Sequence, residues 1–212
     1  MSEGLRRETF ENHETIITQS CTGTGKTTAI AKHMESHTEK DTKFLSITTR
    51  MSLAGQHEKS SENLRLKNYQ DLKANLYDAS ALTICLNSLM KLDALSEEEI
   101  ENYIIYIDEV SSFMEFTNND LLDGILKRIV NLLTRLMKHA KKVIVSDALI
   151  NDSTFELLKH RPLSTTVCLT NSFKKFSGVP AVRPRSEEAF LSKLVEHCNA
   201  GLPFCSGRTP AT

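Results

Sequence analysis

The residues Ser-Cys-Thr-Gly-Thr-Gly-Lys-Thr at positions 20–27 constrain the fold of this chain more than any other segment. They follow a β-type run at 15–18, Thr-Ile-Ile-Thr, and precede a stretch at about 27–37 where apolar residues recur near helical spacing. No proline or glycine interrupts that stretch. A strand, a glycine-containing loop and a helix in this order predict a loop that binds the phosphates of a nucleoside triphosphate.

Each residue type in the loop has a physical reason to be there. Gly23 and Gly25 let the backbone turn tightly, so that successive amide N–H groups point at phosphate oxygens. Lys26 is expected to reach the β- and γ-phosphates, and the Thr27 hydroxyl is expected to ligate Mg²⁺. Ser20 stands where the pattern usually has glycine, and a residue this small still allows the turn. The predicted nucleotide-binding residues are Thr22, Gly23, Thr24, Gly25, Lys26, Thr27 and Thr28.

The rest of the chain alternates short apolar β-type runs with amphipathic helical stretches. The further predicted strands are 44–48, 64–69, 81–86, 103–107, 143–145 and 165–169, and the further predicted helices are 51–58, 88–92, 154–160 and 187–199. A long helix is expected after cap residues at 118–120, with a core-facing stripe of Leu122, Ile125, Leu126, Ile129, Leu133 and Leu136. This alternation predicts an α/β fold, a parallel sheet with helices on both faces.

Two acidic residues, Asp108 and Glu109, directly follow the most apolar β-type run of the sequence. Ligands gather outside the carboxyl ends of parallel strands, so we expect Asp108 beside the phosphate loop, holding Mg²⁺ directly or through water. Glu109 is expected to orient and polarise an attacking water, which completes a catalytic set with Lys26 and Asp108. Ser146 and Asp147 follow a later buried strand, where hydrogen bonding toward Glu109 could relay the state of the γ-phosphate.

Composition narrows the classes of function. The 26 basic and 27 acidic residues give a formal net charge of −1, so any contact with a polynucleotide must be local rather than a general positive field. The five cysteines lack the spacing of zinc ligands, and we expect them to be reduced and buried. A charged amino terminus, and no apolar run near the roughly 20 residues that cross a bilayer, predict a soluble intracellular protein without a membrane partner.

The order of these segments resembles the first RecA-like domain of a superfamily 2 helicase. Residues 22–27 resemble motif I, and residues 49–56 resemble the P-T-R-x-L-A-x-Q segment of motif Ia with one extra residue. Asp-Glu-Val-Ser at 108–111 stands where motif II usually has D-E-x-D or D-E-x-H, and Ser-Asp-Ala at 146–148 stands where motif III has S-A-T. Segments 68–72, 82–89 and 107–110 resemble, more narrowly, the replication-origin-binding proteins of the herpesvirus type. The resemblance covers about residues 14–172.

This resemblance implies a RecA-like P-loop NTPase domain that uses ATP and Mg²⁺ as part of a DNA helicase acting in replication. It implies that Thr49 and Arg50, with Ser88, contact the backbone of single- or double-stranded DNA, and that Ser146 and Asp147 couple this contact to the nucleotide. A motor of this kind needs a second RecA-like domain, in cis or in trans, which supplies an arginine finger. We expect a flexible amino terminus at 1–13, the RecA-like domain at 14–172, and a linker, a helix and the truncated start of a second domain at 173–212, hence a fragment that unwinds nothing alone.

Two other functions stay open at this point. A P-loop kinase would transfer phosphate to a small molecule or nucleotide, although kinases usually lack a base beside the metal carboxylate, where this chain has Glu109. A nucleotide-gated interaction module would use ATP to order the loops around Arg50 and Ser111 for a partner protein.

Overall fold

The structure is a computed structural model, and it describes residues 9–21, 24–35, 42–60, 64–72, 76–117, 123–172 and 186–200. The chain divides into two compact units, residues 1–175 and residues 176–212. Each unit is described by itself.

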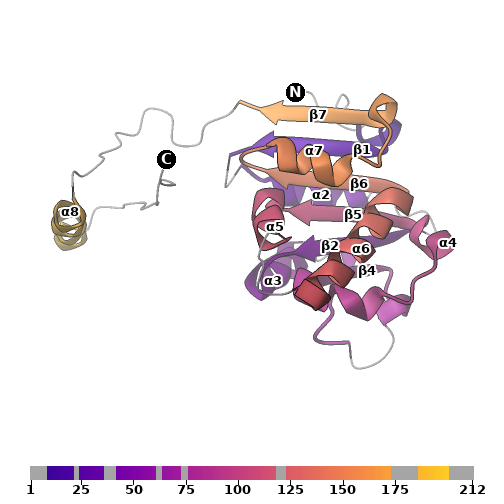
Figure 1. Cartoon of the computed structure of the whole chain (residues 1–212). Coiled ribbons are helices and arrows are strands. Elements are labelled where there is room, and N and C mark those ends of the chain that lie inside the picture. The colour runs from indigo at the N-terminus through magenta and orange to yellow at the C-terminus, as the bar shows by residue number, and fades with distance from the viewer. Residues whose placement is uncertain are drawn as a thin grey trace. The chain divides into compact units, whose positions relative to one another are not determined.

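The first unit is built on a seven-stranded sheet with the order β3-β4-β2-β5-β6-β1-β7 (Figure 1). All of its strand pairs are parallel, which confirms the predicted parallel sheet. The strands are β1 (Thr15–Ser20), β2 (Lys43–Thr48), β3 (Lys67–Asn68), β4 (Ala81–Cys85), β5 (Tyr103–Asp108), β6 (Lys142–Asp147) and β7 (Thr166–Asn171).

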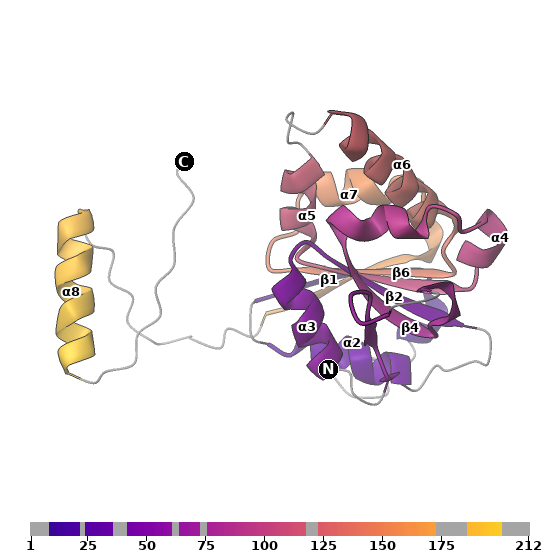
Figure 2. The same cartoon turned by 90° about the horizontal axis from the view of Figure 1, so that it is seen from below.

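The strands form because their side chains are apolar on both faces of the sheet. Every residue of β4 and β5 is buried. Along β5, Ile105 and Ile107 enter the larger core cluster while Ile104 and Tyr106 enter the smaller one, as the alternation of side chains in a strand requires. A strand buried on both faces needs cover on both, and the helices lie on the two sides of the sheet (Figure 2).

The helices of this unit are α2 (Lys26–Glu35), α3 (Met51–Ser60), α4 (Glu97–Ile100), α5 (Val110–Thr117), α6 (Asp123–His139) and α7 (Asp152–Leu158). Short 3₁₀ helices are η2 (Leu76–Asp78), η3 (Leu86–Leu92) and η5 (Leu163–Thr165). Buried Ile30, Ala31 and Met34 of α2 belong to the smaller cluster, whereas the buried face of α6 belongs to the larger one. The sequence did not indicate α4 and α5, which are only four and eight residues long.

The core-facing stripe of α6 is predicted correctly except at its start. Leu126, Ile129, Leu133 and Leu136 are buried, but Ile125 is 64% exposed. The helical angle of Ile125 matches the stripe, and the next residue, Leu126, is buried, so helical position alone does not decide which of these side chains the core covers. Leu122 and the expected cap residues at 118–120 lie outside the described residues.

The predicted strand 64–69 is wrong in length, because only the two residues of β3 pair with β4. Arg65 has a φ of 50°, in the left-handed region, and this interrupts the extended backbone before the strand can begin. The apolar residues that suggested a longer strand are still buried: Leu64 and Leu66 pack in the smaller cluster and Tyr69 in the larger one.

In the second unit the structure describes one helix, α8 (Glu187–Asn199), with the bounds that the sequence predicts. It begins because the Ser186 hydroxyl accepts a hydrogen bond from the Ala189 amide, as an N-cap does. Within the described residues, no helix is both long enough and apolar enough to cross a membrane. The predicted linker at 173–185 lies outside the described residues.

The prediction of buried cysteines is wrong for most of those the structure describes. Cys21, Cys85, Cys168 and Cys198 are all free thiols, but of these four only Cys85 is buried. Two of the exposed thiols lie on elements whose outer side faces solvent, Cys168 on the edge strand β7 and Cys198 on α8.

Candidate nucleotide and metal site

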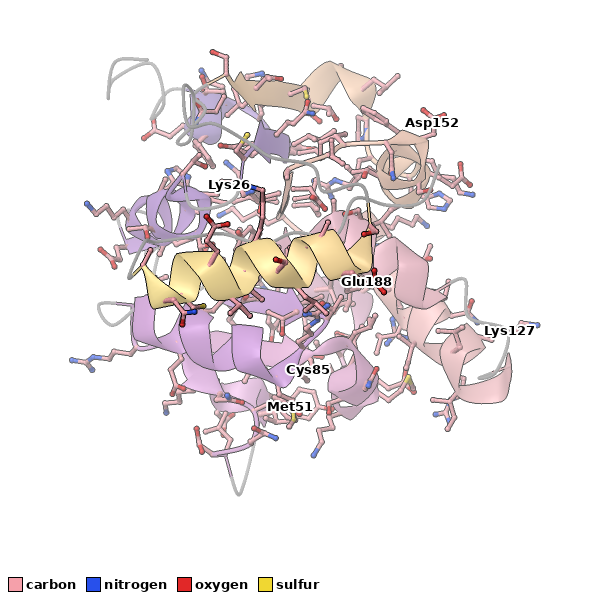
Figure 3. All side chains as sticks on the ribbon, turned by 90° about the vertical axis from the view of Figure 1, so that its left-hand side faces the viewer. Lys26, Met51, Cys85, Lys127, Asp152 and Glu188 are labelled. Carbon is pink, nitrogen blue, oxygen red and sulfur yellow. The ribbon has the colours of Figure 1, made fainter. Side chains whose placement is uncertain are left out.

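The predicted site residues collect at the carboxyl edge of the sheet. Because every strand points the same way, the residues that follow β2, β5, β6 and β1 open on this one edge. Figure 3 views the sheet from the side toward which the arrowheads of Figure 1 point, and Lys26 lies on this side. Asp108 ends β5, Asp147 ends β6, and the phosphate loop begins at the end of β1.

The described part of the phosphate loop has the backbone that its glycines permit. Gly25 has a φ of +82°, a conformation that a residue with a side chain rarely adopts. The helix follows at once: the Gly25 carbonyl accepts from the Ala29 amide, and Lys26 is the first residue of α2. The Lys26 ammonium donates to the Ser20 carbonyl at 2.5 Å, which holds it across the loop. Thr22 and Gly23 lie outside the described residues.

The structure explains why serine is accepted at position 20. Its side chain is 3% exposed, and its hydroxyl lies 2.5 Å from the Thr24 hydroxyl across the loop. The side-chain amide of Asn171, at the end of β7, donates to the same Ser20 oxygen at 3.1 Å. The serine hydroxyl therefore ties the two sides of the loop to the neighbouring strand, a contact that glycine could not make.

An open pocket of about 390 Å³ lies against this loop. Residues of β1, the first turns of α2 and the end of β7 line it, among them Ser20, Gly25, Lys26 and Asn171, with Phe10 at one side. Phe10 is held by its packing on the His33 ring, with the two ring centroids 4.4 Å apart. The pocket thus joins the phosphate loop to a partly apolar wall.

The Asp108 carboxylate accepts four hydrogen bonds. Its Oδ2 accepts from the Thr27 hydroxyl at 2.9 Å and from His57 Nε2 at 3.2 Å. Its Oδ1 accepts from the Ser146 hydroxyl at 2.6 Å and from the Glu109 amide at 3.1 Å. A carboxylate offers about four acceptor positions, and these four donors fill them.

These contacts fix the charge of Asp108. Burial alone would raise its pKa, but the hydrogen bonds from His57, Ser146 and Thr27 hold the pKa well below the ordinary value of a carboxyl group. Burial and the negative charge of Asp108 both raise the pKa of Tyr106. Asp108 is therefore ionised and Tyr106 protonated at neutral pH.

Thr27 and Asp108 together have the chemistry of a Mg²⁺ site. Mg²⁺ prefers oxygen ligands, and both residues offer oxygen beside the loop that would hold the phosphates. Because the Thr27 hydroxyl donates its hydrogen to Asp108, its lone pairs are free to face a cation. The residues present fit a magnesium ion, with Thr27 as the better direct ligand and Asp108 as the adjacent negative charge.

Glu109 has a strained backbone. Its φ is 55°, in the left-handed region, where a residue other than glycine pays about 1–2 kcal/mol. Its carbonyl accepts from the Phe113 amide, so Glu109 lies directly before α5 and accepts a hydrogen bond from its first turn. Strain of this kind gathers at functional sites, which adds a structural reason to regard Glu109 as functional.

The strain predicts an unusual response to glycine at position 109. We expect Glu109→Gly to be as stable as the unchanged protein or more stable by up to about 1 kcal/mol, because relief of the left-handed backbone outweighs the added entropy of the unfolded chain. Glu109→Gln keeps the strain and should not gain this stability. Urea unfolding of the three proteins without nucleotide measures the difference, and a glycine variant clearly less stable than the glutamine variant contradicts the prediction.

Ser146 and Asp147 lie at the end of β6, but their hydrogen bonds differ from those that the sequence suggested. The Ser146 hydroxyl donates to Asp108 rather than toward Glu109, and it lies 2.9 Å from the Tyr106 hydroxyl. Asp147 accepts from the amide and the hydroxyl of Ser111, at 2.7 and 2.5 Å. The expected relay to Glu109 is thus replaced by two separate links, one from β6 to Asp108 and one from β6 to the start of α5.

The residues expected to contact nucleic acid also lie at this edge of the sheet. Thr48 of β2 and Cys85 of β4 are paired neighbours, so the segments that follow them, with Arg50 and Ser88, begin side by side. Arg50 is exposed and Ser88 partly exposed, as a contact with a polynucleotide requires. The Thr49 hydroxyl is buried and has no hydrogen-bond partner among the described residues, so this side chain is a poorer candidate for such a contact than Arg50.

Three residues of the site were missed by reasoning from sequence: His57, Ser46 and Tyr106. Ser46 and Tyr106 are paired neighbours on β2 and β5, and a polar atom in each of two apolar runs was a signal that could have been used. His57 had no such signal, because its contact with Asp108 spans 51 positions and depends on where α3 lies.

Comparison with known proteins agrees with this geometry. Residues 1–149 match the family described as type III restriction enzyme, res subunit (ResIII). The chain belongs to this family. It is 31% identical over 143 residues to a protein of Acanthamoeba polyphaga mimivirus that bears the provisional name of replication origin-binding protein. That match covers 64% of this chain and 18% of the viral protein, so the chain spans less than a fifth of this relative.

Solved structures of helicases share the fold of this ResIII chain. A DEAD box protein from Methanococcus jannaschii matches with a TM-score of 0.56 and 14% identity over 89% of this chain and 53% of its own. The DEAD-box helicase Mss116, bound to single-stranded RNA and UDP-BeF, matches with a TM-score of 0.59 and 15% identity. The match covers 92% of this chain and 45% of the Mss116 chain. The resemblance to the first RecA-like domain of superfamily 2 helicases, and to the origin-binding type, is confirmed. The roles of individual residues stay predictions.

Proposed function

We propose that this ResIII domain binds ATP with Mg²⁺ and is the nucleotide-binding half of a nucleic-acid-dependent ATPase of the replication-origin-binding type. The observation that carries the proposal is the contact of Thr27 with Asp108, 2.9 Å between hydroxyl and carboxylate. It brings the end of the phosphate loop onto the carboxylate that follows β5, across 81 positions of the chain. A phosphate loop alone would indicate binding, and the acidic pair beside it indicates hydrolysis.

In this proposal each residue has one task. The amides of the loop from Thr22 to Thr28 and the Lys26 ammonium bind the phosphates, and Thr27 ligates the cation. Mg²⁺, when bound, neutralises charge on the β- and γ-phosphates. Asp108 accepts the hydrogen bond of the Thr27 hydroxyl and places its negative charge near the cation. Glu109 orients the attacking water. Ser146 connects Asp108 to β6, and Asp147 connects β6 to Ser111 at the start of α5.

The proposed partner is DNA, bound through its backbone at Arg50, Thr49 and Ser88. The viral relative is named for origin binding, the solved Mss116 helicase is bound to single-stranded RNA, and Arg50 is exposed at the carboxyl edge of this sheet. The chain spans about half the length of these helicases, so a second RecA-like domain, in cis or in trans, is part of the proposal. Such a domain supplies an arginine finger, which contributes about 10³–10⁵ in rate.

Equilibrium binding of a fluorescent ATP analogue, with and without Mg²⁺, tests the proposal. We expect Mg²⁺-dependent binding at or below millimolar analogue, and slow release of free phosphate that single-stranded DNA accelerates. A chain that binds no ATP–Mg at millimolar concentration contradicts the proposal. Phosphate that appears on an added acceptor instead of in solution would support a kinase, and partner binding that follows nucleotide without hydrolysis would support an interaction module.

A further inference from the structure

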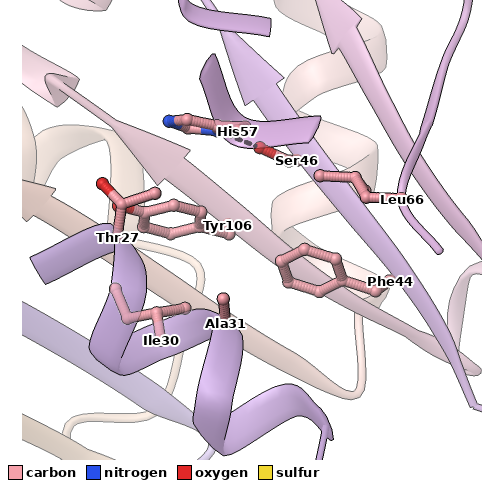
Figure 4. A pocket seen from close by; sticks show the side chains of 8 residues that line it. All are labelled: Thr27, Ile30, Ala31, Phe44, Ser46, His57, Leu66 and Tyr106. Carbon is pink, nitrogen blue, oxygen red and sulfur yellow. Dashed lines mark hydrogen bonds between the residues drawn. The ribbon is translucent and has the colours of Figure 1, made fainter. Parts of the chain in front are cut away.

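His57 is a buried imidazole whose two nitrogens both contact the interior of the site. It lies on α3, is 3% exposed, and places Nε2 at 3.2 Å from Asp108 Oδ2. Its Nδ1 lies 2.7 Å from the Ser46 hydroxyl on β2, and its ring stacks on Tyr106 of β5 with centroids 5.6 Å apart (Figure 4). Contacts with three residues of the neighbouring strands β2 and β5 leave the ring little freedom to move.

The direction of these hydrogen bonds follows from the charge of Asp108. An ionised carboxylate carries no hydrogen, so His57 Nε2 must donate to it. On the far side of the carboxylate, the Tyr106 hydroxyl donates to Ser146, because Ser146 gives its own hydrogen to Asp108. Asp108 is therefore held by donors from α3 and β6 on its two oxygens, in the orientation in which Oδ2 meets Thr27.

The helix that carries His57 begins at Met51, directly after Thr49 and Arg50. A displacement of the segment at 49–50 would therefore move α3, and α3 reaches Asp108 through His57. The rings of His57 and Tyr106 line one small pocket together with apolar side chains, Ile30, Phe44 and Leu66 among them (Figure 4). The contact of His57 with Asp108 is therefore enclosed rather than exposed to solvent.

We propose that His57 is a positioning residue, which holds Asp108 toward Thr27 and so connects the segment proposed to bind DNA with the magnesium-binding end of the nucleotide site. The inference rests on the proposed ATP–Mg site. His57 itself touches neither substrate nor metal in this scheme, and its effect passes through the orientation of one carboxylate.

Two polar substitutions of similar size separate donor placement from mere packing. In His57→Gln the side-chain nitrogen can reach the place of Nε2, whereas in His57→Asn it falls one bond short. We expect His57→Asn to need at least about fivefold more Mg²⁺ for half-maximal binding of a fluorescent ATP analogue, and His57→Gln to stay within about twofold of the unchanged protein. Thermal unfolding by circular dichroism checks that both variants are folded.

The connection to DNA is tested by adding an oligothymidylate to the same titration. In the unchanged protein, the oligonucleotide should lower the Mg²⁺ concentration for half-maximal binding of the analogue. In His57→Asn the oligonucleotide should still bind, but this shift in the Mg²⁺ requirement should vanish. Arg50→Ala serves as the control that loses the oligonucleotide itself. The positioning role would be overturned if the unchanged protein and both His57 variants needed equal Mg²⁺, or if Gln and Asn weakened Mg²⁺-dependent analogue binding equally. The connection between the DNA segment and the magnesium site would be overturned if the oligonucleotide still lowered the Mg²⁺ requirement of His57→Asn. Failure of the unchanged protein to bind the analogue would instead refute the nucleotide site.

Discussion

Lys26→Ala is expected to weaken ATP–Mg binding by about 10- to 150-fold, because the variant loses charge-assisted hydrogen bonds worth about 1.5–3 kcal/mol. Lys26 is the first residue of α2 and already lies across the loop, on the Ser20 carbonyl. No other cation among the predicted loop residues could replace it. Titration with a fluorescent ATP analogue measures the change.

The control for this variant is Lys32→Ala. Lys32 is an exposed residue in the last turn of the same helix, so its loss changes the net charge equally without touching the loop. We expect it to bind the analogue within about twofold of the unchanged protein, as surface charges contribute little. If the two variants bind alike, Lys26 does not contact the phosphates and the proposed site is wrong.

The second large effect is expected on stability, at Arg161. This guanidinium is buried after α7, where it donates to the Thr15 hydroxyl and to three backbone carbonyls, those of Glu14, Met137 and Ala140, at 2.7–3.3 Å. It thus joins the end of α6 to the start of β1. Burial lowers the pKa of Arg161, although the group remains a cation at neutral pH.

We expect Arg161→Met to destabilise the first unit by about 3–5 kcal/mol, because three buried acceptors and one part-buried acceptor lose their donor at once. The matched control is Lys159→Ala two residues away, whose exposed ion pair with Glu156 should be worth less than about 1 kcal/mol. Urea unfolding followed by circular dichroism compares the two. A midpoint for Arg161→Met equal to that of the control would show that water replaces the guanidinium without cost.

The site could be predicted where its chemistry lies in contiguous residues. The loop at 20–27 and the acids at 108 and 109 each follow an apolar run, and in a parallel sheet the ends of such runs meet at one edge. The same reasoning failed for Ser146, whose place at the end of β6 was correct but whose partner is Asp108. A position at the end of a strand predicts the region of the fold in which a side chain lies. Its hydrogen-bond partner depends on how the neighbouring elements pack.

The sequence by itself determined the parallel α/β fold, the phosphate loop and the acidic pair, because alternation of strands and helices and short motifs are properties of neighbouring residues. The tertiary structure alone decided that His57 meets Asp108 and that Arg161 ties α6 to β1, contacts that cross 51 and up to 147 positions of the chain. It also decided that Ile125 is exposed in spite of its helical angle. These outcomes depend on where whole helices lie on the sheet, and that is set by the sum of the core contacts rather than by any local pattern.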